Sequence, residues 1–263
     1  MRTIPSGQAL AAFALLFLLY HGAEWMILRA GSPAGFLGIS FLFLATAWML
    51  GRQAGGLQAW FLSSGRRSRR LFTGGLLAGL LSAGIVWGLQ LAAGTERATP
   101  VPSVRAAVPS AVLLLAGCFL SSLTEDILVR GLLFRYLGAR VPPVLFVVLS
   151  ALLYAGNHIY RLGEPAYMLY AFVLGVQYAV PLVLTRNLSY TIAQHWAGNI
   201  VYHISATLFV TVAGPSTLSP LLLAALVQAL LLPLHYVLPS RIGRRSNAVR
   251  PSSAPIRHSS AFS

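Results

Sequence analysis

The chain has 263 residues, of which 57% are hydrophobic and only 9% are charged, and its mean hydropathy is +0.73. A water-soluble domain of this length could not bury so much apolar surface, so the composition excludes that class and indicates an integral membrane protein. The net charge of +14 does not indicate nucleic-acid binding, because the arginines interrupt long apolar runs and do not line a polar surface. We therefore expect a lipid bilayer as the partner of this chain, and no nucleic acid.

Apolar stretches recur along most of the chain. A helix needs roughly 20 residues to cross the core of a bilayer. The stretches that approach this length are residues 9–28, 35–50, 72–93, 108–138, 143–160, 166–185, 188–211 and 217–238. Turn-forming residues separate them, for example Gly31-Ser32-Pro33 and Pro142-Pro143. The sequence therefore predicts an all-α, polytopic fold of about eight transmembrane helices.

The distribution of arginine predicts the orientation of these helices, because Lys and Arg accumulate in cytoplasmic loops. If the amino terminus lies inside, only four arginines fall outside, namely Arg29, Arg97, Arg105 and Arg161. The arginines on or toward the inner side are Arg2, Arg52, Arg66, Arg67, Arg69, Arg70, Arg130, Arg135, Arg140, Arg186, Arg241, Arg244, Arg245, Arg250 and Arg257. This asymmetry predicts that both termini are cytoplasmic.

Domain organisation is simple. Residues 1–240 are predicted to form a single transmembrane domain, and we see no internal repeat. Residues 241–263 are rich in Ser, Pro and Arg and predict a disordered basic cytoplasmic tail. All 19 basic residues are Arg, a slight indication of a GC-rich bacterial genome, so we expect the bacterial plasma membrane as the location. Nothing in the sequence indicates the oligomeric state.

Ionisable residues inside a membrane span are costly, so each of them is a candidate functional residue. The chain has only five acidic residues, and two of them, Glu125 and Asp126, are adjacent within the fourth span. Asp126 and Arg130 are four residues apart, so on a helix they share a face and can form an ion pair. Glu125 would then be free to point elsewhere.

Two further polar pairs have the same spacing. Tyr154 and His158 end the fifth span, and His195 and Asn199 lie in the seventh. The prolines at 142 and 143 predict a helical hairpin, with Glu125 16 residues before position 141 and His158 17 residues after it. At about 1.5 Å per residue the two side chains lie at nearly the same depth, so Glu125 and His158 can face each other.

These three pairs resemble the motifs of the CAAX-protease and bacteriocin-processing family of intramembrane endopeptidases, also called Abi proteins. The family's first motif is two acidic residues, three others and Arg, similar to Glu125 through Arg130. Its second is Phe, three others and His, similar to Tyr154 through His158, and its third is His, three others and Asn, similar to His195 through Asn199. The resemblance covers residues 108–205.

This chain departs from the family at two positions of these motifs. Asp126 stands where the family usually has Glu, and Tyr154 where it usually has Phe. Asp is one methylene shorter than Glu, so an ion pair with Arg130 requires that the helix or the Arg side chain adjust.

The resemblance implies an intramembrane endopeptidase of the glutamic type, with no cofactor and no bound metal. Glu125 would activate a water molecule and His158 would orient the same water. His195 and Asn199 would polarise the scissile carbonyl. Asp126 and Arg130 would support the site. The substrate would be a membrane-anchored peptide or protein that loses a leader peptide or a carboxy-terminal anchor.

Other functions are compatible with the same residues. Glu125, His158 and His195 have the composition of a catalytic zinc site. Cys118 precedes Glu125 by seven residues and could act as a thiol nucleophile, although a core position is the simpler interpretation. A transporter would need matched broken helices, which we do not find. A non-catalytic immunity or scaffold protein on the same fold is the principal alternative.

A few remaining residues have a structural interpretation. His21 with Glu24 in the first span, and His203 one turn beyond Asn199, belong to no motif, and we expect structural or gating roles for them. Gly75 with Gly79 and Gly84 with Gly88 have the small-residue spacing of helix packing contacts.

Overall fold

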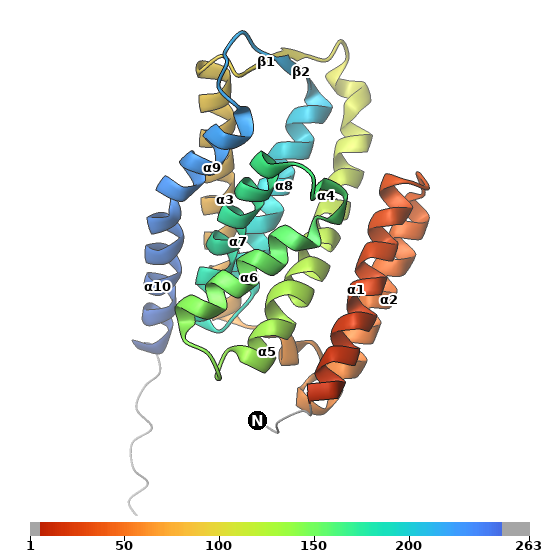
Figure 1. Cartoon of the computed structure of the whole chain (residues 1–263), viewed down its shortest axis with the longest axis vertical. Coiled ribbons are helices and arrows are strands. Elements are labelled where there is room, and N and C mark those ends of the chain that lie inside the picture. Colours follow the sequence, from red (N-terminus) through yellow and green to blue (C-terminus); the bar gives the residue numbers. More distant parts are fainter. Residues whose placement is uncertain (1–5, 249–263) are drawn as a thin grey trace, which may run out of the picture.

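The computed structural model describes residues 6–248, and about four fifths of them are helical (Figure 1). The long helices are α1 (Ser6–Leu28), α2 (Pro33–Gly51), α3 (Arg66–Ala92), α4 (Val104–Asp126), α6 (Pro143–Asn157), α7 (Pro165–Thr185), α8 (Ser189–Leu208), α9 (Pro220–Leu230) and α10 (Leu232–Ala248). The short elements are η1 (Arg52–Ala54), η2 (Gly56–Trp60), the π-helical segment η3 (Ile127–Leu132), α5 (Leu133–Leu137) and η4 (Ile159–Arg161). The predicted all-α polytopic fold is therefore confirmed.

Two short strands were not expected. β1 (Glu96–Pro100) follows α3, and β2 (Phe209–Ala213) follows α8. They pair antiparallel, with Glu96 opposite Ala213 and Pro100 opposite Phe209. The ladder links the ends of two helices that lie against each other, at the end of the bundle opposite the start of α1 (Figure 1).

Helices occupy the positions of all the predicted spans, but they are not equally suited to a bilayer. Within residues 6–248, six helical stretches are long and apolar enough to cross a membrane. They are Gly7–Leu28, Pro33–Ala54, Arg66–Ala92, Ala107–Leu137, Pro165–Thr185 and Pro220–Gly243. α6 is apolar but has only 15 residues, and α8 is outside this set although it has 20. The number eight thus stays a prediction.

Proline and serine explain where several helices begin. Pro33, Pro143, Pro165 and Pro220 each occupy the first turn of a helix, where a missing N–H costs nothing. Ser32 accepts a hydrogen bond from the amide of Gly35 at 3.1 Å, which caps the start of α2. These starts agree with the predicted turns.

α3 and α8 form the closest helix pair of the bundle. A Cβ atom on Gly75 would lie 2.2 Å from the carbonyl oxygen of Tyr190, and one on Gly79 would lie 2.6 Å from Cβ of Ala197. Only glycine allows this approach, so the predicted packing role of Gly75 and Gly79 is confirmed. Nothing lies within 4 Å of the corresponding positions on Gly84 and Gly88, so that part of the prediction is wrong.

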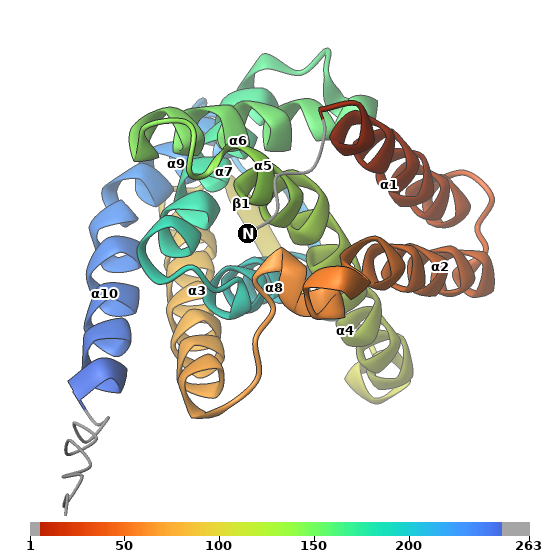
Figure 2. The same ribbon diagram turned by 90° about the horizontal axis from the view of Figure 1, so that it is seen from below.

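α1 and α2 form a hairpin at one side of the bundle (Figure 2). Leu16 of α1 and Phe43 of α2 are fully buried in the same hydrophobic cluster as Ile127 and Leu128 of the π-helical segment and Tyr154 of α6. This contact brings the first helix next to the acidic residues of the fourth span.

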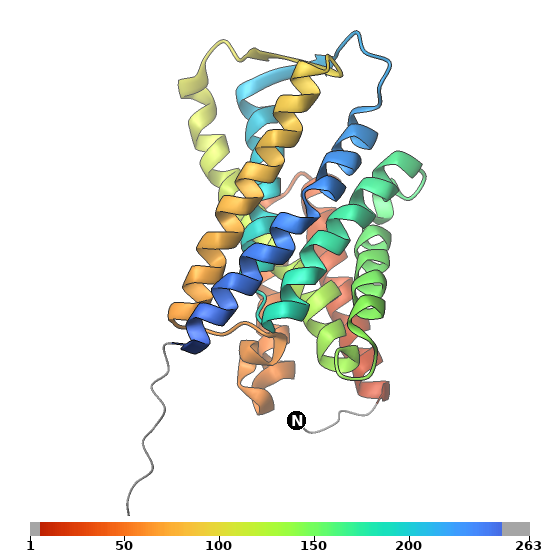
Figure 3. The same cartoon turned by 90° about the vertical axis from the view of Figure 1, so that its left-hand side faces the viewer.

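The start of α1 and the end of α10 lie at the same end of the bundle, as an even number of crossings requires (Figures 1 and 3). α10 continues to Ala248, past position 241, from which the sequence predicts a disordered tail. The rest of that tail, residues 249–263, and Arg2 of the predicted inner side lie outside the described residues.

Candidate active site

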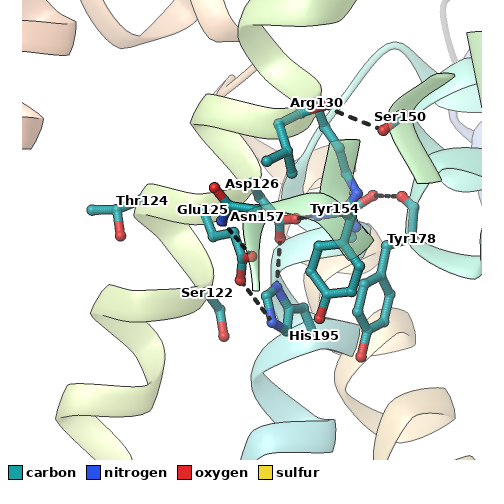
Figure 4. A network of polar contacts seen from close by, with 12 residues as sticks. Ser122, Thr124, Glu125, Asp126, Arg130, Ser150, Tyr154, Asn157, Tyr178 and His195 are labelled. Carbon is teal, nitrogen blue, oxygen red and sulfur yellow. Dashed lines mark hydrogen bonds and ion pairs between the residues drawn. The ribbon is translucent and has the colours of Figure 1, made fainter. Parts of the chain in front are cut away.

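The two acidic residues of the fourth span lie at the end of α4, and both are buried. Glu125 is 3% exposed and Asp126 is 0% exposed. The helix changes to π-helical geometry immediately after them, and π-bulges inside α-helices often mark functional sites. Figure 4 shows side chains from α6, α7 and α8 gathered around this point.

Asp126 and Arg130 form the predicted ion pair, and both side chains are fully buried. Arg130 lies within the π-helical segment that begins immediately after Asp126. The Arg130 guanidinium also lies over the rings of Tyr154, at 4.5 Å, and Tyr178, at 5.1 Å. Aromatic faces attract a desolvated cation, so the two tyrosines help to hold Arg130 in the membrane.

His195 of α8 lies between the two carboxylates. Its Nε2 is 3.6 Å from Oε2 of Glu125, and its Nδ1 is 3.4 Å from Oδ2 of Asp126. The ring of Tyr178 stacks on the imidazole at a centroid distance of 4.8 Å. These distances are longer than direct hydrogen bonds but within ion-pair range, so a small movement or one water molecule would connect the groups.

The side chain that contacts Glu125 from α6 is Asn157, which sequence reasoning missed. Asn157 Nδ2 donates a hydrogen bond to Glu125 Oε1 at 2.9 Å, and Asn157 is 2% exposed. The available signal was a lone amide at the end of an otherwise apolar helix, directly before the histidine of the motif.

His158 does not pair with Glu125 among the described residues, although their equal depth allowed it. Across residues 6–248 no hydrogen bond or ion pair joins them. The reason is that α6 ends at Asn157, and His158 leaves the helix with φ −82° and ψ 59°. Its Nδ1 lies 2.8 Å from the carbonyl oxygen of Tyr154, and its ring contacts those of Tyr154 and Tyr167. The Tyr154 ring therefore contacts both histidines, because the centre of the His195 ring lies 5.7 Å from the centre of the Tyr154 ring.

Asn199 is one turn along α8 from His195 and contacts α4. Its Nδ2 donates to Ser122 Oγ at 3.0 Å, and Ser122 in turn donates to the carbonyl oxygen of Cys118 at 2.8 Å. Asn199 thus links α8 to the turn of α4 that precedes Glu125, and within residues 6–248 no hydrogen bond joins it to Glu125.

Two alternative chemistries lack an assembled site among the described residues. No group of three or more His, Cys, Asp and Glu side chains there has an arrangement suited to a metal ion. The zinc set of Glu125, His158 and His195 is not brought together, because His158 turns toward Tyr154 and Tyr167. Cys118 is buried and free, and no histidine is bonded to it in this part of the chain.

A small polar cavity of about 30 Å³ lies beside the stacked pair of Tyr178 and His195. Buried amides line it from three helices, namely Gln177, Gln194 and Gln228. Gln177 Nε2 donates to Gln228 Oε1 at 3.0 Å, whereas Oε1 of Gln194 has no protein partner among residues 6–248. A polar cavity of this size can hold a water molecule.

The loop after His158 is held by an exposed ion pair. Arg161 pairs with Glu164, and this hydrogen-bonded contact keeps the pKa of the Glu164 carboxyl below its ordinary value. The Arg161 guanidinium also lies 4.1 Å from the centre of the Tyr167 ring, which contacts His158. The loop therefore fixes the aromatic residues on the His158 side of the site.

Fold and site together define a multi-span membrane protein whose polar centre lies within its helices. Residues 107–201 match the family model described as Type II CAAX prenyl endopeptidase Rce1-like. This match confirms the predicted resemblance to the CAAX-protease and bacteriocin-processing family, and because that family consists of proteases it supports a CAAX-type intramembrane protease. The matched segment contains every predicted site residue and excludes α1, α2 and α3. No curated protein matches the chain.

Proposed function

We propose that the protein is an intramembrane endopeptidase that hydrolyses peptide bonds of membrane-associated substrates with a water molecule activated by Glu125. The observation that carries this proposal is the position of the buried Glu125 carboxylate, which lies between the Asn157 amide and the His195 imidazole. A carboxylate held in this way, shielded from bulk solvent, has the placement of a general base.

In this mechanism Glu125 takes a proton from water while the hydroxide attacks the scissile carbonyl carbon. The Asn157 amide fixes one oxygen of Glu125, so the other oxygen, Oε2, is the one that faces His195. Glu125 then returns the proton to the leaving amine, which completes the hydrolysis without any net change in the protein.

His195 is suited to stabilise the charges that develop during this reaction. Asp126 faces its Nδ1, which favours a proton on that nitrogen and offsets the positive charge that develops on the ring during the reaction. Nε2 then faces Glu125 and the reacting atoms, where it can share the proton or polarise the carbonyl oxygen. Arg130 neutralises Asp126, and Tyr154 and Tyr178 support Arg130.

Asn199 and His158 have less direct positions. We propose that Asn199, bonded to Ser122, forms one wall of the site. Its amide is the next side-chain hydrogen-bond donor along α8 after His195. We assign His158 to the side of the site beyond the Tyr154 ring, facing the substrate as it approaches. The cavity beside Tyr178 is a suitable store for the attacking water.

We further propose a membrane-anchored peptide or protein as the substrate and a bacterial plasma membrane as the location. Removal of a leader peptide or of a carboxy-terminal anchor fits a catalytic centre that lies among membrane helices. No cofactor is required by this chemistry.

The first prediction is that Glu125→Gln lowers cleavage of a membrane peptide by roughly 10²- to 10⁴-fold. Gln keeps the shape and can still accept a hydrogen bond from Asn157, so the thermal unfolding temperature should hardly change. The assay uses purified wild-type protein and the variant in detergent, with and without a strong chelator.

Glu96→Gln is the matched control, because it removes an acid from β1, far from the site in the sequence and in the fold. Chelator-sensitive activity would replace the glutamic mechanism with a metal mechanism. Full complementation of a deletion strain by Glu125→Gln would instead favour the immunity or scaffold function.

A further inference from the structure

Three helices long enough to cross a membrane end beside one another, at the end of the bundle where α1 begins. The apolar stretch of α3 begins at Arg66, that of α7 ends at Thr185, and that of α10 ends at Gly243. The start of α3 lies next to the end of α10 (Figure 3), because a Cβ atom on Gly74 would lie 2.6 Å from Cδ1 of Ile242. α7 also packs against α10.

Arg67 connects these three helix ends. Its Nη2 donates a hydrogen bond to the carbonyl oxygen of Thr185 at 3.0 Å, and a Cβ atom on Gly243 would lie 3.7 Å from the same nitrogen. The Nε of Arg67 is buried and has no protein partner among residues 6–248. We call the residues gathered here the α3–α7–α10 junction; they are residues 66–70, 185–187 and 241–243.

Buried polar contacts hold the junction in shape. Asn187, which is 1% exposed, donates from Nδ2 to Ser63 Oγ at 2.7 Å and to Ser68 Oγ at 2.8 Å. The amide of Leu188 donates to the carbonyl oxygen of Phe61 at 2.9 Å. These bonds fasten the turn between α7 and α8 to the start of α3, so the positions of the helix ends do not depend on the exposed arginines.

Five more arginines belong to the junction, and all of them are exposed. They are Arg66, Arg69, Arg70, Arg186 and Arg241. On α3, residues 66, 67 and 70 are three or four positions apart, apart from the neighbours 66 and 67, so they share one side of the helix. The junction therefore concentrates cationic side chains from three helix ends.

No carboxylate balances these charges. The whole sequence has five acidic residues, and Glu125 and Asp126 are buried in the candidate active site. Glu24 lies near the far end of α1, and Glu96 lies in β1 at the opposite end of the bundle. Glu164 precedes α7, so it is about 30 Å along that helix from the junction.

The level of the arginines indicates which anion they bind. They lie where three apolar stretches end, which is the level of the lipid phosphates. Guanidinium groups bind phosphate with paired hydrogen bonds, and clusters of roughly four to eight basic residues beside a membrane helix bind anionic headgroups. The orientation of a membrane protein requires only that its arginines lie on one side, and it does not require them to gather on neighbouring helix ends.

We propose that the α3–α7–α10 junction binds the headgroup phosphate of an anionic phospholipid, with Arg67 at its base and Arg66, Arg70 and Arg241 as its exposed cations. A zwitterionic lipid is disfavoured, because its ammonium group meets only positive charge here. The inference goes beyond the proposed function and does not depend on it, since lipid binding needs no cleavage. A bound lipid stabilises the turn that leads into α8, the helix that carries His195.

The test is a lipid titration of the purified, delipidated protein in detergent, followed by native mass spectrometry. We expect the wild-type protein to bind phosphatidylglycerol more tightly than phosphatidylcholine. The double variant Arg66→Gln, Arg241→Gln should bind phosphatidylglycerol more weakly by about fivefold for each arginine removed, and bind phosphatidylcholine as before. The rise in unfolding temperature that phosphatidylglycerol produces should shrink in the same variant. Arg67 stays unchanged, because its hydrogen bond to Thr185 is part of the fold.

The double variant Arg52→Gln, Arg140→Gln is the matched control. It removes two exposed arginines from η1 and from the turn before α6, which are outside the junction, and it changes the net charge equally. This variant should keep the wild-type affinity for phosphatidylglycerol. Equal binding of both lipids by the wild-type protein, or equal weakening in the two double variants, would overturn the proposal. Displacement of the lipid by an equal concentration of inorganic phosphate would show a site for free phosphate and would overturn the lipid assignment.

Discussion

Position 126 holds one member of an ion pair buried inside a membrane helix. The Asp126 carboxylate pairs with Arg130 of the π-helical segment that follows it, and both groups are fully buried. Because water cannot solvate either charge there, the pair depends on its own contact, on the tyrosine faces over Arg130 and on the nearby His195. Breaking one member should therefore be more damaging than removing both charges.

We predict that Arg130→Leu lowers the free energy of unfolding by about 3–5 kcal/mol, because it leaves Asp126 as an uncompensated buried charge. The double variant Asp126→Asn, Arg130→Leu should recover part of this loss but none of the activity, since His195 would lose its anionic neighbour. Thermal unfolding in detergent and peptide cleavage measure the two effects.

Arg161→Leu provides the comparison for this prediction. Arg161 and Glu164 form an ion pair of similar local spacing, but both are solvent-exposed. Exposed pairs contribute little, so this variant should unfold close to the wild-type temperature. If the Arg130 double variant were no more stable than Arg130→Leu alone, the buried pair would not be the cause of the loss.

At the scale of helices, counting residues predicts how far along the bundle the end of α6 lies, but it does not predict which of its side chains point toward α4. Counting residues from the Pro142-Pro143 turn placed the end of α6 level with Glu125, and the structure confirms this, because Asn157 contacts Glu125. The count contains no information on which side chain turns toward α4. That choice depends on where α6 stops, and His158 lies just beyond its last residue.

The glycine spacing on α3 predicted helix packing correctly for Gly75 and Gly79, which lie against the backbone of α8. Gly75 and Gly79 are buried against α8, whereas Gly84 and Gly88, with the same spacing on the same helix, are exposed. The motif spacing alone could not distinguish them, because the distinction comes from the partner helix. Gly75 and Gly79 also pack against α8, the helix that carries His195.

We predict that Gly75→Ala destabilises the protein by about 1–3 kcal/mol, because its new methyl group would overlap the Tyr190 carbonyl and force α3 and α8 apart. Gly84→Ala should be neutral or stabilising by up to about 1 kcal/mol, since it adds helix propensity in open space. Unfolding temperatures of the two variants in one detergent give the comparison. Equal destabilisation by both would show that the packing contact does not limit stability.

For the whole molecule, the composition and the apolar stretches were sufficient to predict a polytopic helical membrane protein. The three motifs lie far apart in the sequence, and their ordered resemblance to one family predicted that Glu125, Asp126 and His195 belong to one site. In the structure His195 lies 3.6 Å from Glu125 and 3.4 Å from Asp126, and their joint role in catalysis stays a proposal. Tyr178 could not be found in this way. It reaches the site from α7, whose sequence contains no such motif, and only the packing of the bundle brings it there.

The orientation of the bundle remains a prediction that rests on arginine. The start of α1, the start of α3 with Arg66 and Arg67, and the end of α10 lie at one end of the molecule, and the strands with Arg97 lie at the other (Figures 1 and 3). If the arginine-rich end is cytoplasmic, the β1–β2 ladder faces the opposite side of the membrane.

We predict that this orientation can be read with single cysteines placed in a Cys118→Ser background. Ser64 and Ala139 are exposed at the arginine-rich end, and Thr99 and Thr217 are exposed near the strands. A membrane-impermeant thiol reagent applied to intact cells should label cysteine at 99 and 217 and leave 64 and 139 unlabelled until the membrane is permeabilised. The native Cys118 should not react before its replacement, because it is buried in α4. Labelling of 64 and 139 from outside, with protection of 99 and 217, would reverse the orientation while leaving the fold and the site unchanged.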